Sequence, residues 1–187
     1  MEALIQADIE LFFWINGHHS PFFDTFFYWV SHKLIWIPFY VLLVYLALKV
    51  YKKLTWLIVL GAALSVGSAD AISTRVIKEN VERFRPTHQP GVMEKVHTVD
   101  GYTGGKYGFV SSHASNVFAL AIFFFIYLKR HYKYLGGILF FWACLVSFSR
   151  IYLGVHYPLD VLGGMVLGSL IGSIFAIFVM FQMKKRA

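Results

Sequence analysis

The chain has 187 residues, of which 58% are hydrophobic and only 14% are charged, and its mean hydropathy is +0.61. This composition is too apolar for an ordinary soluble domain, and the length suits one domain of several membrane-spanning helices. The net charge of +7 does not indicate a nucleic-acid partner, because many of the cations gather where apolar runs end, as they do in the loops of membrane proteins.

The first 33 residues predict two short helices that do not cross the membrane. In residues 3–16, the acidic side chains of Asp8 and Glu10 interrupt an apolar helix, which favours a helix lying in the membrane interface. The apolar segment at 21–31 is too short to span, because a crossing needs about 20 residues. Residues 3–31 leave room for an additional span only if they cross in an irregular way.

Five longer apolar runs follow, and each predicts one membrane-spanning helix. They cover residues 34–48, 54–77, 113–128, 134–149 and 158–183, with an irregular loop rich in glycine at 79–112. We therefore predict an all-α fold, a polytopic membrane helix bundle of five or six spans with an N-terminal interfacial segment at 1–33. We expect residues 1–187 to form a single domain.

The distribution of charge predicts how this bundle is oriented. Three basic clusters contain none of the ten acidic residues: Lys49, Lys52 and Lys53; Lys129, Arg130 and Lys133; Lys184, Lys185 and Arg186. By the positive-inside rule these clusters face the cytoplasm. The C-terminus is then cytoplasmic, and the loop at 79–112 and the polar segment at 149–160 lie outside.

Small residues recur at intervals of four on two of the predicted spans. Gly164, Gly168 and Gly172 form one such stripe, and the sequence has a second at Gly61, Ser65 and Ala69. Such stripes let helices approach closely. Packing inside one bundle is the favoured interpretation, and packing between subunits stays open, so the oligomeric state is not predicted.

Three cations near the predicted outer face indicate a phosphate ligand. They are Lys78, Arg85 and Arg150, and no acidic residue beside them would neutralise all three. Guanidinium groups match phosphate oxygens with paired hydrogen bonds, and lysine adds a point charge. A phosphoryl transition state spreads negative charge over its equatorial oxygens, which three cations would stabilise.

Two histidines and a carboxylate complete a candidate catalytic site. His156 lies two residues before Pro158, which favours the first position of a helix, so Asp160 falls in the first turn. Asp160 can then orient the imidazole of His156 and leave its other nitrogen free as a nucleophile. His113 begins another predicted span and could protonate the leaving oxygen as a general acid. Ser111 and Ser112 are expected to cap that span and to add donors to the phosphate site.

These segments resemble the signature of the type 2 phosphatidic acid phosphatase superfamily. The first signature segment, Lys-x6-Arg-Pro, is matched at Lys78–Pro86, and the third, Ser-Arg-x5-His-x3-Asp, at Ser149–Asp160. The middle segment, Pro-Ser-Gly-His, is represented by Val110-Ser111-Ser112-His113, so that valine replaces proline and serine replaces glycine. A serine fits the glycine position only if its backbone does not need a positive φ.

The resemblance implies a phosphatase that uses neither a metal nor a cofactor and forms a phosphohistidine intermediate. It implies that His156 is the nucleophile, Asp160 its orienting group and His113 the general acid. The implied phosphate ligands are Lys78, Arg85, Arg150, Ser111 and the backbone of Ser112. It also implies a lipid phosphate or pyrophosphate substrate in a bacterial cytoplasmic membrane, with no nucleic-acid partner.

The preferred substrate from the sequence is undecaprenyl pyrophosphate. Bacteria release this lipid on the outer side of the membrane, which is the side on which the site is predicted to lie. Phosphatidylglycerol phosphate, phosphatidic acid and lipid A are the alternatives within the family. A non-catalytic lipid-binding or lipid-translocating protein is the alternative of another class, and a haloperoxidase-like enzyme is a further one. Asp70 and Arg75 are expected to pair or to brace the site, whereas Arg83 is interpreted as a solvated loop charge.

Overall fold

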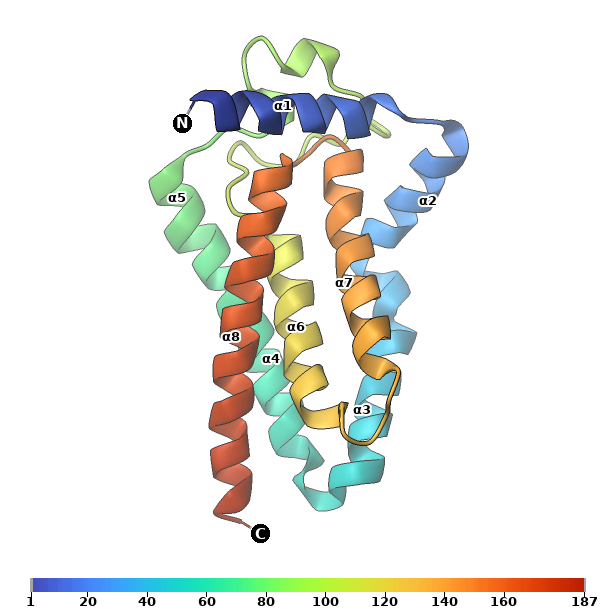
Figure 1. Ribbon diagram of the computed structural model, residues 1–187, viewed down its shortest axis with the longest axis vertical. Coiled ribbons are helices and arrows are strands. Elements are labelled where there is room, and N and C mark those ends of the chain that lie inside the picture. The colour runs from blue at the N-terminus through green and yellow to red at the C-terminus, as the bar shows by residue number, and fades with distance from the viewer. Residues whose placement is uncertain (1, 187) are drawn as a thin grey trace.

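The computed structural model describes residues 2–186, and these residues form helices and loops without a β-strand. The all-α prediction is thus confirmed. Five long helices run along the long axis of the molecule, with α6 between the others (Figure 1). They are α3 (Ile37–Tyr51), α4 (Thr55–Ala71), α6 (Ser112–Leu128), α7 (Leu135–Tyr152) and α8 (Pro158–Lys184).

Each predicted apolar run corresponds to one of these long helices. Helices α3 and α4 belong to one apolar segment, Lys33–Val81, which turns back at Lys52, where φ is 49°. That segment, α7 and α8 are long and apolar enough to cross a membrane, and α6 is a shorter apolar helix. The chain therefore has the helices of an integral membrane protein. The number of membrane crossings stays a prediction.

Short helical pieces connect the long helices. The apolar segment begins with the 3-10 turn η1 (Lys33–Trp36), and η2 (Lys52–Leu54) joins α3 to α4. Helix α4 continues through a π-helical stretch, η3 (Ile72–Ile77), into α5 (Lys78–Val81). The following loop holds the turns η4 (Pro86–His88) and η5 (Met93–Lys95) and a single bridge between Phe84 and Tyr107.

The N-terminal helix α1 (Glu2–Gly17) lies across one end of the bundle, and α2 (Pro21–Ser31) leads from it along α7 (Figure 1). A transverse helix agrees with the interfacial helix that the sequence predicts. Asp8 of α1 points away from solvent. The side chain is 1% exposed and faces the interior, where it joins α1 to the site described below.

The glycine stripe on α8 packs inside the bundle, against the backbone of α6. A Cβ atom at Gly164 would lie 2.5 Å from the carbonyl oxygen of Ser111, the N-cap of α6, and one at Gly172 would lie 2.5 Å from that of Ala119. One at Gly168 would overlap the carbonyl of Ser115. The two backbones can approach this closely only because glycine has no side chain. This contact fixes the start of α6 beside the start of α8, where the candidate catalytic residues lie.

Candidate active site

A cavity of about 680 Å³ lies within the bundle, between residues of α3, α4, α6 and α7 and of the segments that connect them. Six of the eight residues that the sequence nominates line it: Lys78, Arg85, Ser112, His113, Arg150 and His156. They come from α5, α6, α7 and two loops, so the fold brings together segments that lie far apart in the sequence. The other two nominated residues, Ser111 and Asp160, are fully buried behind this wall.

Arg85 reaches the cavity through a glycine-lined passage. Its Nε donates to the carbonyl of Tyr107 over 3.1 Å, and its guanidinium lies so close to Gly104 that a Cβ there would overlap it. Burial and the neighbouring Arg150 lower the pKa of Arg85. Its Nη1 has no hydrogen-bond partner among residues 2–186. A buried cation with an unused donor fits an anionic ligand.

The guanidinium of Arg150 has more side-chain hydrogen bonds than that of Arg85, and one of its nitrogens also lacks a partner among the described residues. One Nη donates to the hydroxyl of Ser31 and the other to the hydroxyl of Tyr102 over 3.0 Å. Burial alone would raise the pKa of Tyr102, but Arg150, Arg85 and Lys33 together outweigh burial and lower it. The Nε of Arg150 has no partner among the described residues. Tyr102 and Ser31 thus aim the guanidinium, a role that the sequence analysis did not assign to either.

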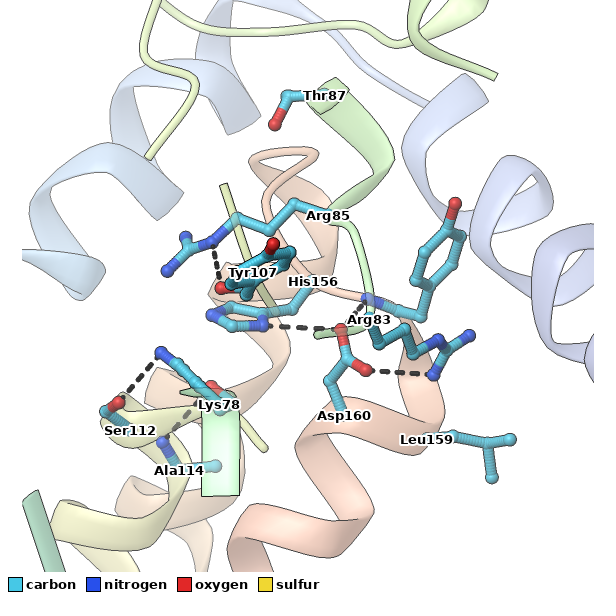
Figure 2. Close-up of polar contacts among 12 residues, drawn as sticks. Lys78, Arg83, Arg85, Thr87, Tyr107, Ser112, Ala114, His156, Leu159 and Asp160 are labelled. Carbon is cyan, nitrogen blue, oxygen red and sulfur yellow. Dashed lines mark hydrogen bonds and ion pairs between the residues drawn. The ribbon is translucent and has the colours of Figure 1, made fainter. Parts of the chain in front are cut away.

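Lys78 and the start of α6 form the third side of the candidate phosphate site. The Lys78 ammonium donates to the Ser112 hydroxyl over 2.9 Å (Figure 2). Ser112 is not among the residues with positive φ, so serine fits where the family motif has glycine. Ser111 caps α6 by accepting from the Ala114 amide over 3.5 Å, and its own amide donates to the Asp160 carbonyl over 2.8 Å.

His156 is 1% exposed and lies between the cations and Asp160. Burial and the nearby Arg85, Arg150 and Lys78 lower the pKa of His156 well below its usual 6.5. The ring is therefore neutral at physiological pH, and a nucleophilic nitrogen must be unprotonated. Figure 2 shows one ring nitrogen facing Asp160 and the other edge of the ring on the side of Lys78 and Arg85.

Asp160 lies in the first turn of α8, as predicted from Pro158 at the first helical position. One carboxylate oxygen accepts from the Tyr157 amide over 3.0 Å and lies 3.4 Å from Nδ1 of His156. That contact is electrostatic, because the geometry is not that of a hydrogen bond and Nδ1 has no such partner among residues 2–186. The predicted position of Asp160 is correct, while the predicted hydrogen bond is not formed here.

Arg83 completes the surroundings of Asp160, and its interpretation as a solvated loop charge was wrong. It donates to the second oxygen of Asp160 over 2.8 Å and to Asp8 of α1 over 2.5 Å. The other oxygen of Asp8 accepts from the Leu159 amide over 2.8 Å. The chain Asp8–Arg83–Asp160 therefore locks α1 and the loop onto α8. The signal in the sequence was Asp8, an acidic residue among the apolar residues of α1. An acid that such a helix buries needs a partner, which here is Arg83.

Two further ionisable residues, Asp70 and His97, lie in different surroundings. Asp70 lines the cavity and accepts from Asn116 over 2.9 Å; it forms no ion pair with Arg75, so the pairing considered from the sequence is wrong. His97 does not line the cavity. It lies 3.0 Å from Asp24 and stacks on His19 with ring centroids 3.6 Å apart.

His19, Asp24 and His97 lie close enough together to be potential metal ligands, but they do not line the cavity. Two imidazoles that stack face to face do not direct their in-plane lone pairs at one common ion. Among the described residues, the phosphate end of the cavity holds cations and histidines and no carboxylate cluster of the kind that binds a hard metal ion.

The inner part of the cavity is apolar. It is bounded by the side chains of Val44 on α3, Val59 on α4, Phe124 on α6 and Trp142 on α7. A space that is cationic at one end and hydrocarbon-like along its length suits an amphiphile with an anionic head. The geometry thus combines a cationic pocket that suits phosphate, a buried neutral imidazole and an apolar inner space.

Comparison with known proteins identifies the family. Residues 54–185 match the model of the PAP2 superfamily. The chain belongs to this superfamily. Within the PAP2 superfamily it is 35% identical to the lipid A 4'-phosphatase of Bacteroides thetaiotaomicron, over 94% of this chain and 78% of that one. It is 38% identical to the lipid A 4'-phosphatase of Porphyromonas gingivalis, over 92% of this chain and 72% of that one.

A solved PAP2 structure confirms the fold. The transmembrane PAP2-type phosphatidylglycerolphosphate phosphatase of Bacillus subtilis superposes with a TM-score of 0.72 at 25% identity. The superposition covers 95% of this chain and 87% of the other. The chain described here is accordingly a PAP2 membrane lipid phosphatase, a phosphoric monoester hydrolase.

Proposed function

We propose that this PAP2 phosphatase removes a phosphate from a glycolipid of the lipid A type. The observation that carries the proposal is its similarity, over more than nine-tenths of the chain, to two proteins named lipid A 4'-phosphatase. Undecaprenyl pyrophosphate, the substrate preferred from the sequence alone, is less well supported than this alternative. The apolar inner cavity suits either lipid, so it does not decide between them.

The first step is binding of the phosphate by the three cations. Arg85 Nη1 and Arg150 Nε have no hydrogen-bond partner in the part of the chain that the structure describes, and the Lys78 ammonium donates to the Ser112 hydroxyl. Donors that are already in position lose little entropy when the phosphate arrives. They also stabilise the charge that spreads over the equatorial oxygens during transfer.

Attack by His156 on phosphorus forms a phosphohistidine and breaks the bond to the lipid oxygen. His113 gives a proton to that oxygen as it leaves. As the imidazole becomes cationic, the nearby Asp160 carboxylate stabilises it. His113, now deprotonated, then takes a proton from water, which attacks the phosphohistidine and releases inorganic phosphate. His156 is thereby restored for the next cycle.

The site faces outward in this proposal. The three basic clusters lie at or beyond the ends of α3, α6 and α8, away from the end of the bundle that α1 covers. The positive-inside rule places such clusters in the cytoplasm. The phosphate site, at the opposite end, would then act on lipids of the outer leaflet of the cytoplasmic membrane.

Phosphate release by the purified protein in detergent tests the proposal. The panel comprises lipid A, phosphatidic acid, phosphatidylglycerol phosphate and undecaprenyl pyrophosphate, each with and without EDTA. We expect lipid A to have the highest kcat/KM, release to survive EDTA, and His156→Ala to abolish it. A higher kcat/KM for undecaprenyl pyrophosphate would overturn the substrate assignment, and loss of activity in EDTA would contradict the metal-independent mechanism.

A further inference from the structure

Asp70 is a carboxylate in an apolar membrane helix, and it faces the cavity. It lies one residue from the end of α4 and remains exposed to the cavity that holds the phosphate site. An ionisable side chain within a membrane-spanning helix is costly and is retained chiefly for function. None of the steps in the proposed mechanism uses this carboxylate.

Asn116, on the facing helix α6, shares this part of the cavity. Its Nδ2 donates to one oxygen of Asp70 over 2.9 Å, and since a carboxylate only accepts, this bond fixes which way the amide points. The Oδ1 of Asn116 is shielded from solvent and has no partner among residues 2–186. The second oxygen of Asp70 likewise receives no hydrogen bond from the described residues.

Asp70 therefore presents one acceptor oxygen to the cavity, and the unpaired Asn116 Oδ1 lies buried beside it. A polar contact that served only to hold α4 against α6 would leave neither a buried amide oxygen unpaired nor a carboxylate facing the ligand space. An acceptor-only surface is complementary to a ligand with hydroxyl or amide N–H groups. It repels a phosphate, which is itself negatively charged.

The position of the pair indicates which part of a lipid it meets. Asp70 precedes Lys78 by eight residues, which is roughly 12 Å along a helix, and Asn116 lies one turn beyond Ser112 on α6. Val59 and Phe124 line the cavity deeper in the bundle. The pair thus lies between the phosphate end and the apolar end, where a bound lipid has the group that links its phosphate to its chains.

We propose that Asp70 and Asn116 form a specificity site that accepts hydrogen bonds from the linking group of the substrate. This inference rests on the proposed function and deepens it. The acylated glucosamine of a lipid A-type substrate carries hydroxyl and amide N–H donors at this position. Phosphatidic acid and undecaprenyl phosphates carry none there, and a site built to bind such donors discriminates strongly against analogues that lack them.

The test compares two substrates in the same purified protein. kcat/KM is measured for lipid A and for phosphatidic acid in mixed micelles, with wild type, Asp70→Leu and Asn116→Leu. A hydrogen bond to a charged group is worth about tenfold to a hundredfold in rate. We expect Asp70→Leu to lower the ratio of the lipid A value to the phosphatidic acid value by that amount, and Asn116→Leu to lower it by about fivefold to tenfold.

The control is Ser173→Ala, which removes a hydroxyl on α8 that donates within its own helix and does not line the cavity. Its substrate ratio should equal that of wild type. An unchanged ratio in Asp70→Leu, or an equal loss on both lipids, would overturn the specificity site. Wild type that hydrolyses phosphatidic acid but not lipid A would instead refute the proposed function, so the two failures are distinguishable.

Discussion

Two carboxylates of the membrane bundle, Asp160 and Asp70, differ in how many protein groups bind their oxygens and in whether they face the cavity. At the start of α8, Asp160 is fully buried and is held by Arg83 and by the Tyr157 amide. At the end of α4, Asp70 faces the cavity with one partner, Asn116. A carboxylate whose oxygens are occupied by the protein is fixed in place, whereas one with an unused oxygen can still bind a ligand.

This contrast suits two different roles: Asp160 positions His156, and Asp70 is proposed to recognise the substrate. The start of α8 is locked to α1 and to the loop after α5, so it can hold His156 in one orientation. At the end of α4, the Asp70 side chain is held by Asn116 alone among the described residues.

Asp160→Asn should lower kcat for lipid phosphate hydrolysis by at least about 100-fold, with a smaller change in KM. The amide keeps an acceptor for Tyr157 but cannot stabilise the imidazolium that forms on His156. Steady-state kinetics in detergent separate the two constants. A rise in KM with unchanged kcat would show that Asp160 serves binding and not catalysis.

Arg83→Gln should lower kcat by about tenfold and the melting temperature by about 5 °C, since it leaves Asp8 and Asp160 without their shared cation. Arg83 is 22% exposed, which moderates the loss through solvent screening. Thermal unfolding in detergent and kinetics measure both effects. Glu79→Gln, an exposed change in the same segment, is the control and should alter neither.

Ser112→Ala should raise KM by about threefold and leave kcat nearly unchanged, because Lys78 loses a hydrogen-bond partner that helps to aim it. Ser112→Gly should have a similar effect, since the backbone at this position does not need a positive φ. Kinetics on one lipid substrate compare the two variants. A glycine variant more active than wild type would show that the serine hydroxyl hinders binding.

The acidic limb of the kcat/KM profile should lie below pH 6.5, with less than a twofold fall between pH 7.5 and 6.5. The sign follows from the lowered pKa of His156: protonation blocks the nucleophile, and a lower pKa moves that loss to more acidic pH. The profile must be corrected for the second ionisation of the substrate phosphate, near pH 6. A corrected limb at or above pH 6.5 would contradict the buried neutral histidine.

The parts of the site that lie within one short segment could be predicted from the sequence. The spacings that join Lys78 to Arg85 and Arg150 to His156 and Asp160 are local, and the structure brings all five together. The helical fold was predictable for the same reason, because apolar runs of membrane length allow few other structures.

Contacts between distant segments could not be predicted in this way. Arg83 and Asp8 are 75 residues apart, and a loop arginine carries no sign of which buried acid it will meet. Ser31 and Tyr102 contact Arg150 because α2 and the loop between α5 and α6 both pack near it in the fold. Similarly, the sequence showed an unusual acid at Asp70, but its partner Asn116 emerges only from the packing of α4 on α6.

Trapping the covalent intermediate tests the central claim, that His156 is the nucleophile, most directly. The protein is mixed with lipid A labelled in its phosphate, quenched in alkali within milliseconds, and digested for mass spectrometry. We predict label on His156 that is stable in alkali and lost in mild acid, as a phosphoramidate is, and no label in His156→Ala. Label on another residue, or label that persists in His156→Ala, would contradict the proposed mechanism.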